Sequence, residues 1–449
     1  MQKALLIKAA LVAITFAILL LPLSMIRGIV VERAARQQAV MQDISASSFG
    51  KQIFAGPVLS LPYVEEYDEE TGVGRERKIE KRRIDRTLRL FPATSELNGT
   101  ATVGEKHRGL FKIRTFNWLA TASGDFVLDG KLKVERTHVD SHIVWGQPVI
   151  SLALSDPRGL VGRPAFEWTG QHIEFERGSG VPGIASGLHA TAAPVDPYQP
   201  QHLPYSLKIN LQGTESLGIV PIADNNRVSL KSDWPHPGFG GQFLPQPESQ
   251  QIGKEGFSAQ WTITALASNA QQQVQTLFDG GKAGLPSIER LDVGFIEPID
   301  IYSLSDRALK YGFLFIGLTF GCFLMFEVQK RLPIHPAQYG LVGLGLVTFF
   351  LLLIALSEHI AFWISYLTAA TACIALLGFY LSAVLQGPAR GASFSIMLTA
   401  LYSALYGLLV SEDSALLLGS LLVFAVVAAA MVLTRKVDWY REGAYEAEG

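Results

Sequence analysis

The hydrophobic positions of this 449-residue chain gather into one N-terminal segment and five C-terminal segments. A bilayer core about 30 Å thick requires roughly 20 apolar residues in a helix. The segments that reach or approach this length are 9–26, 311–326, 339–357, 360–385, 391–411 and 414–434. The second is short, but the long side chains of Lys310 and Glu327 can reach the interface from its two ends. The pattern predicts six transmembrane helices, one before and five after a long polar stretch.

The polar stretch shows a different periodicity, in which short runs of alternating apolar and polar residues are separated by Gly, Pro, Asn and Asp. This alternation is typical of strands in a sandwich or barrel. The expected strands are 58–64, 87–91, 109–115, 124–128, 142–154, 172–176, 206–211, 228–230, 258–267 and 292–296. One helix-like patch, 269–278, interrupts them. We expect an all-β, sandwich-like domain, built as one sandwich or as two that divide near the Gly/Pro-rich residues 180–204.

These patterns divide the chain into four parts. Residues 1–30 form a transmembrane anchor, 31–308 the β-rich domain, 309–436 a five-helix transmembrane bundle and 437–449 a tail. A cleaved signal peptide is the alternative for the first part. It is disfavoured because the apolar run is long and lacks an A-x-A-like cleavage site.

The Lys and Arg residues predict how the spans are oriented. Short connections rich in Lys and Arg lie on the cytoplasmic side of a membrane. If the spans alternate, one side holds Lys3, Lys8, Lys330, Arg331, Arg390, Arg435 and Lys436. The opposite connections, 357–359 and 411–413, have no basic residue. Arg27, Arg33 and Arg36 are the exception, at the start of the large domain. The prediction is that both termini are cytoplasmic and the β domain is translocated across the membrane.

Charge and cysteine content narrow the chemistry. The formal net charge is −2, which gives no indication of nucleic-acid binding. The two cysteines, Cys322 and Cys373, fall in predicted spans, so the β domain has no disulfide or cysteine metal site. A cluster of basic residues lies within 75–89, with acids before and among them. It indicates either a solvated, charged strand edge or a site for an anionic partner such as a lipid headgroup.

No motif in the β domain has mechanistic spacing: HExxH, GxSxG, SxxK and P-loop patterns are absent. We therefore predict no catalytic residues, cofactor or metal. The most unusual segment is 232–245, a loop dense in aromatics, prolines and glycines that includes Trp234, His236 and Phe239. Such a loop either caps a β core or binds sugars or partner strands by stacking. His236 is a poor metal ligand, because the sequence brings it no second one.

Ionisable residues in the bundle are candidates because burying them in lipid is costly. Glu327 and His335 lie at one end of the predicted spans, and Glu358 and His359 at the other. At the rim these side chains are expected to be interfacial and hydrated unless they serve a function. A proton or cation relay calls for an acid near the membrane centre, and none is predicted there.

Several segments together resemble the CreD family of bacterial inner-membrane proteins. They are 29–33, Gly56-Pro57, 108–111, 155–159, 233–239, 310–315, Glu327, 335–343 and 356–359. The resemblance covers essentially the whole chain. It implies a role in cell-envelope integrity, regulation by a two-component system, and association with colicin tolerance and β-lactam stress. It supplies no catalytic set, and Gly238, where the family usually has Ser, argues against a hydroxyl nucleophile there.

Three functions remain as hypotheses. The first is a non-enzymatic interaction or structural module, in which the β domain contacts a periplasmic protein or cell-wall component and the bundle holds it in the bilayer. The second is a transporter or channel that uses the bundle. The third is an envelope-modifying enzyme acting where the β domain meets the membrane. The oligomeric state stays open.

Overall fold

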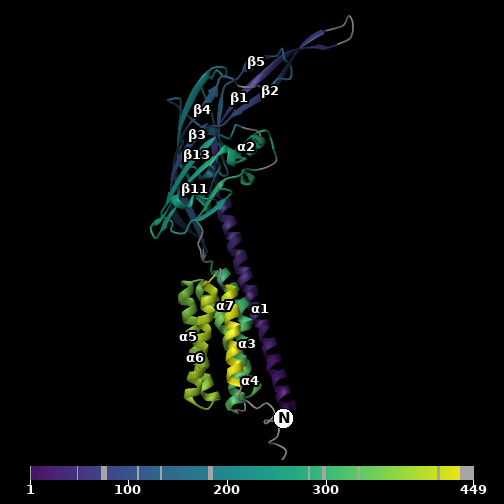
Figure 1. Ribbon diagram of the computed structural model, residues 1–449, viewed down its shortest axis with the longest axis vertical. Coiled ribbons are helices and arrows are strands. Elements are labelled where there is room, and N and C mark those ends of the chain that lie inside the picture. The colour runs from purple at the N-terminus through teal and green to yellow at the C-terminus, as the bar shows by residue number, and fades with distance from the viewer. Residues whose placement is uncertain are drawn as a thin grey trace, which may run out of the picture. The chain divides into compact units, whose positions relative to one another are not determined.

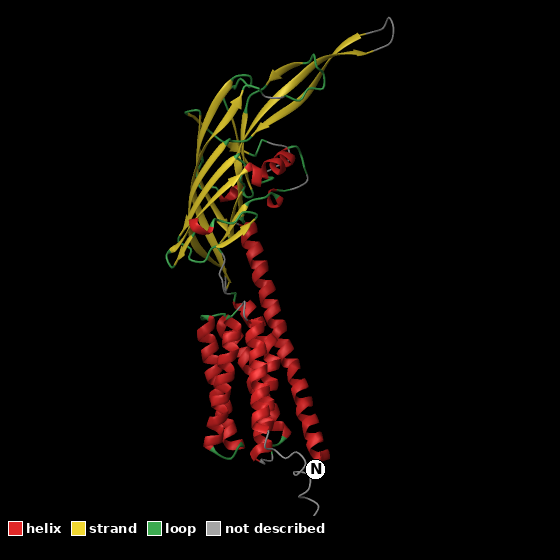
Figure 2. Cartoon of the chain, viewed as in Figure 1, coloured by secondary structure: helices red, strands yellow, loops and turns green. Residues whose placement is uncertain are grey.

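The computed structural model describes most of the chain. The described residues are 2–47, 49–71, 78–108, 111–131, 134–180, 186–281, 284–295, 300–330, 334–411 and 415–434. The predicted tail, 437–449, lies outside them. The chain forms two compact units: unit 1 comprises Met1–Ala39 with Ile299–Gly449, and unit 2 comprises Val40–Pro298. Figure 2 shows the long helices gathered in one unit and the strands in the other.

Unit 1 is built of long helices (Figure 1). They are α1 (Gln2–Ser47), α3 (Ile301–Lys330), α4 (Pro336–Ser357), α5 (Phe362–Val384), α6 (Pro388–Val410) and α7 (Ala415–Thr434). Among the described residues, five are long and apolar enough to cross a membrane: α1, α3, α4, α5 and α6. The predicted arrangement, with one span before the β-rich domain and the others after it, is therefore confirmed for five spans. Helix α7 covers the sixth predicted segment, and its role as a span stays a prediction.

Two helices are longer than the apolar segments that predicted them. Helix α1 continues without a break to Ser47, well beyond the predicted anchor at 1–30. Helix α3 begins at Ile301, ten residues before the predicted span. Hydropathy alone missed these first turns because Asp306, Arg307 and Lys310 make them polar. The Asp306 carboxylate is neutralised there by Lys310 one turn later, at 2.7 Å.

Helix α1 packs on the bundle through small residues of α3 and α4. Its buried side chains recur at spacings of three, four and seven residues: Val12, Leu19, Leu23, Ile26 and Val30. They form a stripe along one face of the helix. A Cβ added at Gly312 would meet Leu23 at 3.2 Å, and one added at Gly343 would collide with Leu19. Close approach of the helices therefore depends on glycine at these positions.

Gly317 and Gly321 of α3 are four residues apart, but only Gly317 faces α1. A Cβ at Gly317 would approach Phe16 at 3.5 Å, whereas one at Gly321 would meet nothing within 4 Å. Gly321 is exposed on the surface of α3. The groove for α1 is formed by Gly312 and Gly317 of α3 together with Gly340 and Gly343 of α4.

Unit 2 contains two β sheets. Sheet A runs in the order β14-β17-β12-β1-β6-β10-β9, and β2 and β5 also pair with β1. Its strands are β1 (Gln52–Thr71), β2 (Lys78–Leu90), β5 (His142–Trp145), β6 (Val149–Leu154), β9 (Glu176–Arg177), β10 (Gly187–Thr191), β12 (Ser216–Ile219), β14 (Gly238–Gly241) and β17 (Leu291–Gly294). Most neighbours are antiparallel; β1 and β12 are parallel.

Sheet B runs in the order β15-β16-β13-β3-β4-β11-β7-β8. Its strands are β3 (Thr94–Arg108), β4 (Phe111–Asp129), β7 (Ala165–Trp168), β8 (Gln171–Ile173), β11 (Pro200–Thr214), β13 (Asn225–Ser232), β15 (Gln251–Gly253) and β16 (Gly256–Thr264). The strands that lie before and after residues 180–204 belong to the same two sheets.

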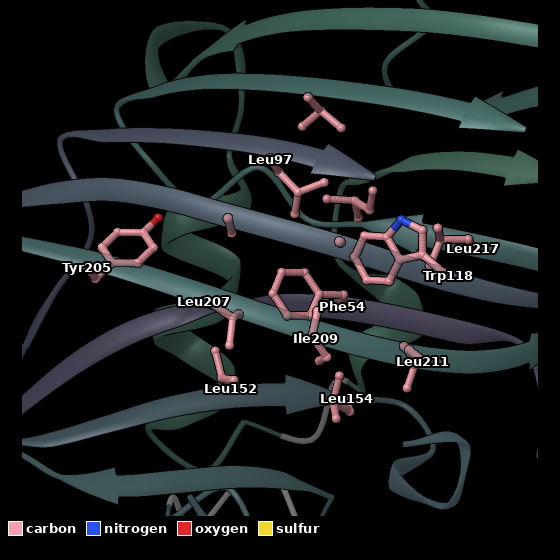
Figure 3. Packing of buried hydrophobic residues seen from close by; sticks show 14 of the residues in the cluster. Phe54, Leu97, Trp118, Leu152, Leu154, Tyr205, Leu207, Ile209, Leu211 and Leu217 are labelled. Atoms are coloured by element: carbon pink, nitrogen blue, oxygen red, sulfur yellow. The ribbon is translucent and has the colours of Figure 1, made fainter. Parts of the chain in front are cut away.

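The two sheets contribute to one hydrophobic cluster. Phe54 and Leu152 of sheet A lie in it with Trp118 and Leu207 of sheet B, as Figure 3 shows. The Trp118 ring is fully buried and meets Phe54 edge to face, with 5.7 Å between ring centroids. Because alternate residues of each strand point inward, the alternation in the sequence is what gives the two sheets a common core.

A second cluster covers the other face of sheet A. Helix α2 (Ala270–Phe278), which the sequence predicted as 269–278, buries Val274, Leu277 and Phe278. These side chains pack with Ile53 and Ile222. Sheet A is therefore apolar on both faces near its centre, whereas the outward side chains of sheet B face solvent. Short 3-10 turns lie at Pro157–Gly159, Pro247–Ser249, Ala265–Ala267 and Leu285–Ser287.

Candidate functional site

The most enclosed carboxylate in the described part of unit 1 is that of Glu327, near the end of α3. The residue is 7% exposed. Lys8 of α1 donates to Oε1, and the Tyr339 hydroxyl of α4 donates to Oε2 at 2.7 Å. The Ile334 backbone N–H also approaches Oε1, at 3.4 Å. Three helices thus meet on one carboxylate.

This burial corrects the expectation that Glu327 is a hydrated rim residue. The sequence places it at a helix end, but the N-terminal helix, distant in sequence, covers it and supplies the countercharge. A buried carboxylate without a partner would be strongly destabilising. The Lys8 ammonium and the Tyr339 hydroxyl compensate for the lost hydration, so the group joins α1, α3 and α4.

A second cluster lies at the opposite end of α4. Glu358 is the C-cap of that helix, and its Oε1 accepts from the Tyr302 hydroxyl of α3 at 3.3 Å. Arg33 Nε of α1 lies 3.6 Å from the same oxygen. Here the Glu358 side chain is 12% exposed and that of Arg33 is 37% exposed. The same three helices meet again, in a more open setting.

Asp306 of α3 extends this second cluster along α1. Arg27 Nε donates to its Oδ1 at 2.9 Å, and Lys310 Nζ lies 2.7 Å from Oδ2. These contacts bear on the basic residues that conflicted with the charge rule in the sequence. Arg27 and Arg33 each face an acid of the bundle, so their charges help to hold α1 against α3 and α4.

The two candidate histidines of the bundle have minor roles in the geometry. His335 is the N-cap of α4: its Nδ1 accepts from Ala337 N at 3.2 Å, and Gln338 Oε1 accepts from His335 N at 3.0 Å. This reciprocal arrangement starts the helix. His359 is exposed. Neither histidine is brought to Glu327 or Glu358 by a contact in the described residues, so the four candidates form no single site.

In unit 2, the Trp234 loop divides into a packed part and an exposed part. Trp234 Nε1 donates to the His236 carbonyl at 2.8 Å, and the Arg114 guanidinium lies 4.4 Å above the Trp234 ring. Phe239 meets Trp261 edge to face at 5.7 Å. His236 itself is exposed. Trp234 and Phe239 both pack against the shared core, which supports the capping interpretation of the loop.

Sequence reasoning missed a buried carboxylate at Glu65. Its side chain is fully buried, and Oε1 accepts from the backbone N–H groups of Thr137 and His138 at 2.7 and 2.9 Å. The hydrogen bond from the His138 N–H, ahead of the other contacts, lowers the pKa of Glu65 to about 2. Arg86 Nε lies 3.4 Å from Oε2. Glu65 lies within an acidic run in the sequence, and only the fold distinguishes it from its exposed neighbours.

The basic cluster of β2 is largely paired with acids. Arg82 meets Glu69, Arg83 meets Glu66 and Arg86 meets Glu65 across the β1–β2 hairpin. Arg89 pairs with Asp279 at the end of α2. These pairs support the interpretation as a charged strand edge. The basic residues at 75 and 77 lie outside the described residues.

In the described part of the chain, neither the cavities nor the groups of possible metal ligands form a catalytic site. A surface cavity of about 250 Å³ lies near Leu160, His172, Phe175 and Arg177. Its carboxylate, Glu174, pairs with Arg163 at 2.8 Å. Within the same residues, no group of three or more His, Cys, Asp or Glu side chains could hold a metal ion.

Comparisons with known proteins identify the family of this chain. The family profile described as "Inner membrane protein CreD" matches residues 4–440. Inner membrane protein CreD of Escherichia coli (strain K12) is 34% identical over 423 residues, which cover 94% of this chain and 91% of that protein. A crystal structure of a two-domain M1 zinc metallopeptidase mutant bound to L-tryptophan is 11% identical over 46% of this chain and 42% of that one. Its TM-score of 0.19 is too low to carry an argument. On the family match and the close relative, this chain belongs to the CreD family of inner membrane proteins.

Proposed function

We propose that the protein supports cell-envelope integrity, including tolerance of β-lactam or colicin stress, by a non-enzymatic interaction of its β domain. The observation that supports this most is the distribution of polar groups. The acids of the bundle described above are engaged by bases of α1 or a tyrosine hydroxyl. Several outward polar side chains of sheet B, among them Asn98, Thr100 and Thr121, instead face solvent.

In this proposal the bundle anchors the β domain. The contacts of Glu327, Asp306 and Glu358 fasten α1 to α3 and α4 at two levels. Both termini are cytoplasmic and the β domain is periplasmic. The distribution of basic residues in the short connections supports this orientation. The two sheets and their shared core fit a sandwich-like module that presents a surface without catalysing a step.

The experiment is site-specific photo-crosslinking in living cells. A photoreactive residue is placed at Thr100 or Ser229 on sheet B, at His236 in the loop, or at Gln275 on α2. The proposal predicts that at least one of these surfaces captures a defined envelope protein or glycan. A matched probe at Phe379, exposed on α5, is expected to capture only lipid or nothing. Absence of any adduct from the β domain at full expression would contradict the proposal.

A further inference from the structure

We propose that a cavity at one edge of the β domain binds a small monocarboxylate with an apolar body. The cavity has a volume of about 250 Å³, and residues from both sheets line it. Strand β8 is the last strand of sheet B and β9 the last of sheet A. The chain crosses from one to the other at Glu174 and Phe175, and both residues line the cavity. The cavity therefore lies where the chain passes between the edges of the two sheets.

Part of the lining is apolar. Leu160, Phe175 and Leu188 line the cavity, and all three belong to or pack against the hydrophobic cluster that the two sheets share. The Phe175 ring lies 5.1 Å, between centroids, from the ring of Phe166, which is fully buried. A ligand that enters the cavity can therefore bury a hydrocarbon group against the core.

One cation lies among these apolar side chains. Arg177 lines the cavity and is directly opposite Leu188 in the register of β9 and β10. Because opposite residues project from the same face of a sheet, the Arg177 side chain leaves sheet A on the face that bears the shared core. Among the described residues, no acid engages Arg177, and its neighbour Glu176 lies 3.8 Å from His189 instead. A guanidinium in this position offers a planar pair of donors to a carboxylate.

The charges around the cavity favour a ligand with a single negative charge. Arg163 Nη1 lies 2.8 Å from Glu174 Oε2, so these two residues contribute no net charge. His172 also lines the cavity and counts as neutral at pH 7. Arg177 therefore leaves the lining with one net positive charge. A monocarboxylate matches this charge, whereas a phosphate dianion would lack a second cation.

Protection of the sheet edge explains a charge at Arg177 but not the cavity beside it. Inward-pointing charges deter edge strands from pairing with other chains, and such a residue needs only solvent around it. Protein interiors are otherwise close-packed, with few voids larger than a water molecule. The space at this edge is much larger than that. An apolar lining, an arginine that no described acid engages and room for a guest together indicate a binding site.

The test uses the full chain in phosphatidylcholine nanodiscs. The probe is 3-(4-fluorophenyl)propanoate, and the width of its fluorine NMR signal reports binding. We expect saturable broadening beyond that given by empty nanodiscs. The amide of the same acid has a similar shape but no charge, and acetate has the charge but no apolar body. Both are expected to compete with the probe at least tenfold more weakly than the unlabelled acid.

Two substitutions are expected to move the affinity in opposite directions. Arg177→Gln removes the cation and should weaken binding at least tenfold, whereas Arg177→Lys, which keeps the charge but not the planar fork, should weaken it about threefold. Glu174→Gln releases Arg163 from its acid and should tighten binding about threefold at low salt. Misfolding cannot produce this gain, so Glu174→Gln keeps the test valid if Arg177→Gln folds poorly. The matched control is Arg227→Gln, at an exposed position on β13, which should bind like the unchanged chain.

Three results would overturn the inference. They are no saturable binding by the unchanged protein, equal competition by the acid and its amide, and a Glu174→Gln variant that binds no more tightly than the unchanged chain. The interaction of the β domain with an envelope partner does not depend on this cavity. The crosslinking experiment and the NMR experiment can therefore fail separately.

Discussion

The bundle and the β domain use their polar side chains in opposite ways. In the bundle, Glu327 is buried and shared by Lys8 and Tyr339, and Glu358 is shared by Arg33 and Tyr302. In the β domain, outward side chains of sheet B such as Asn98, Thr100 and Thr121 are exposed to solvent. The first arrangement joins helices, and the second leaves groups available to a partner. The proposed function follows this difference, with anchoring by the bundle and recognition by the β domain.

The largest expected effect on the anchoring side is that of Glu327→Ala. It leaves the partly buried Lys8 ammonium without its acid, and breaking a buried pair costs about 3 kcal/mol. We expect the helical signal at 222 nm to be lost at a lower denaturant concentration in mixed micelles. Glu32→Ala is the control, because the Glu32 side chain is 72% exposed on α1. Equal stability of the two variants would show that Glu327 does not fasten α1.

Gly343→Val tests the groove for α1 without touching a charge. The added Cβ would collide with Leu19 and approach Phe320 at 3.0 Å, and overpacking of this kind costs about 2 kcal/mol. The same substitution at Gly321 meets nothing within 4 Å and is expected to be nearly neutral. Comparison of the two denaturation midpoints checks the groove, and a loss at Gly321 equal to that at Gly343 would refute it.

A smaller effect, confined to acid, is expected in the β domain. The pKa of Glu65 is lowered from 4.5 to about 2 by the backbone N–H groups that it accepts from. Its stabilising contribution is therefore full above about pH 4.5 and is lost as the pH falls from there toward about 2. We expect the melting temperature of the β domain to fall in this window, and to fall less in Glu65→Gln. Glu66→Gln is the control, because Glu66 pairs with Arg83 on the hairpin surface. If the melting temperature falls equally little in both variants, Glu65 is not the source of the acid sensitivity.

The smallest expected effect is that of Glu358→Gln. The pair of Glu358 with Arg33 is partly open to solvent, and such pairs contribute less than about 1 kcal/mol. The carboxamide introduced by this substitution can still accept from the Tyr302 hydroxyl. We therefore expect unchanged membrane levels and unchanged survival under β-lactam stress. Loss of survival with a folded, inserted protein would instead favour the transporter hypothesis, in which Glu358 lines the path.

Sequence periodicity predicted much of the fold and little of the contact pattern. Apolar segments located five spans, and 269–278 was predicted as a helix. Alternation located parts of β1, β4, β11, β13 and β16 but missed β3, which lies in the middle of sheet B. Glu327 was misjudged because its burial depends on Lys8, more than 300 residues away, and hydropathy describes each segment alone. Glu65 was missed for the same reason: its partners, Thr137 and His138, come from a distant loop. For Trp234 and His236, composition identified the loop, but only packing separated its buried part from its exposed part.

The most direct measurement of the central claim is survival under β-lactam stress in cells that carry the chain with residues 49–295 replaced by a short flexible linker. Membrane fractions must show that the shortened protein inserts at the level of the full chain. If the β domain performs the interaction and the bundle only anchors it, tolerance falls to that of cells lacking the protein. Full tolerance from the inserted, shortened chain would contradict this assignment and place the function in the bundle.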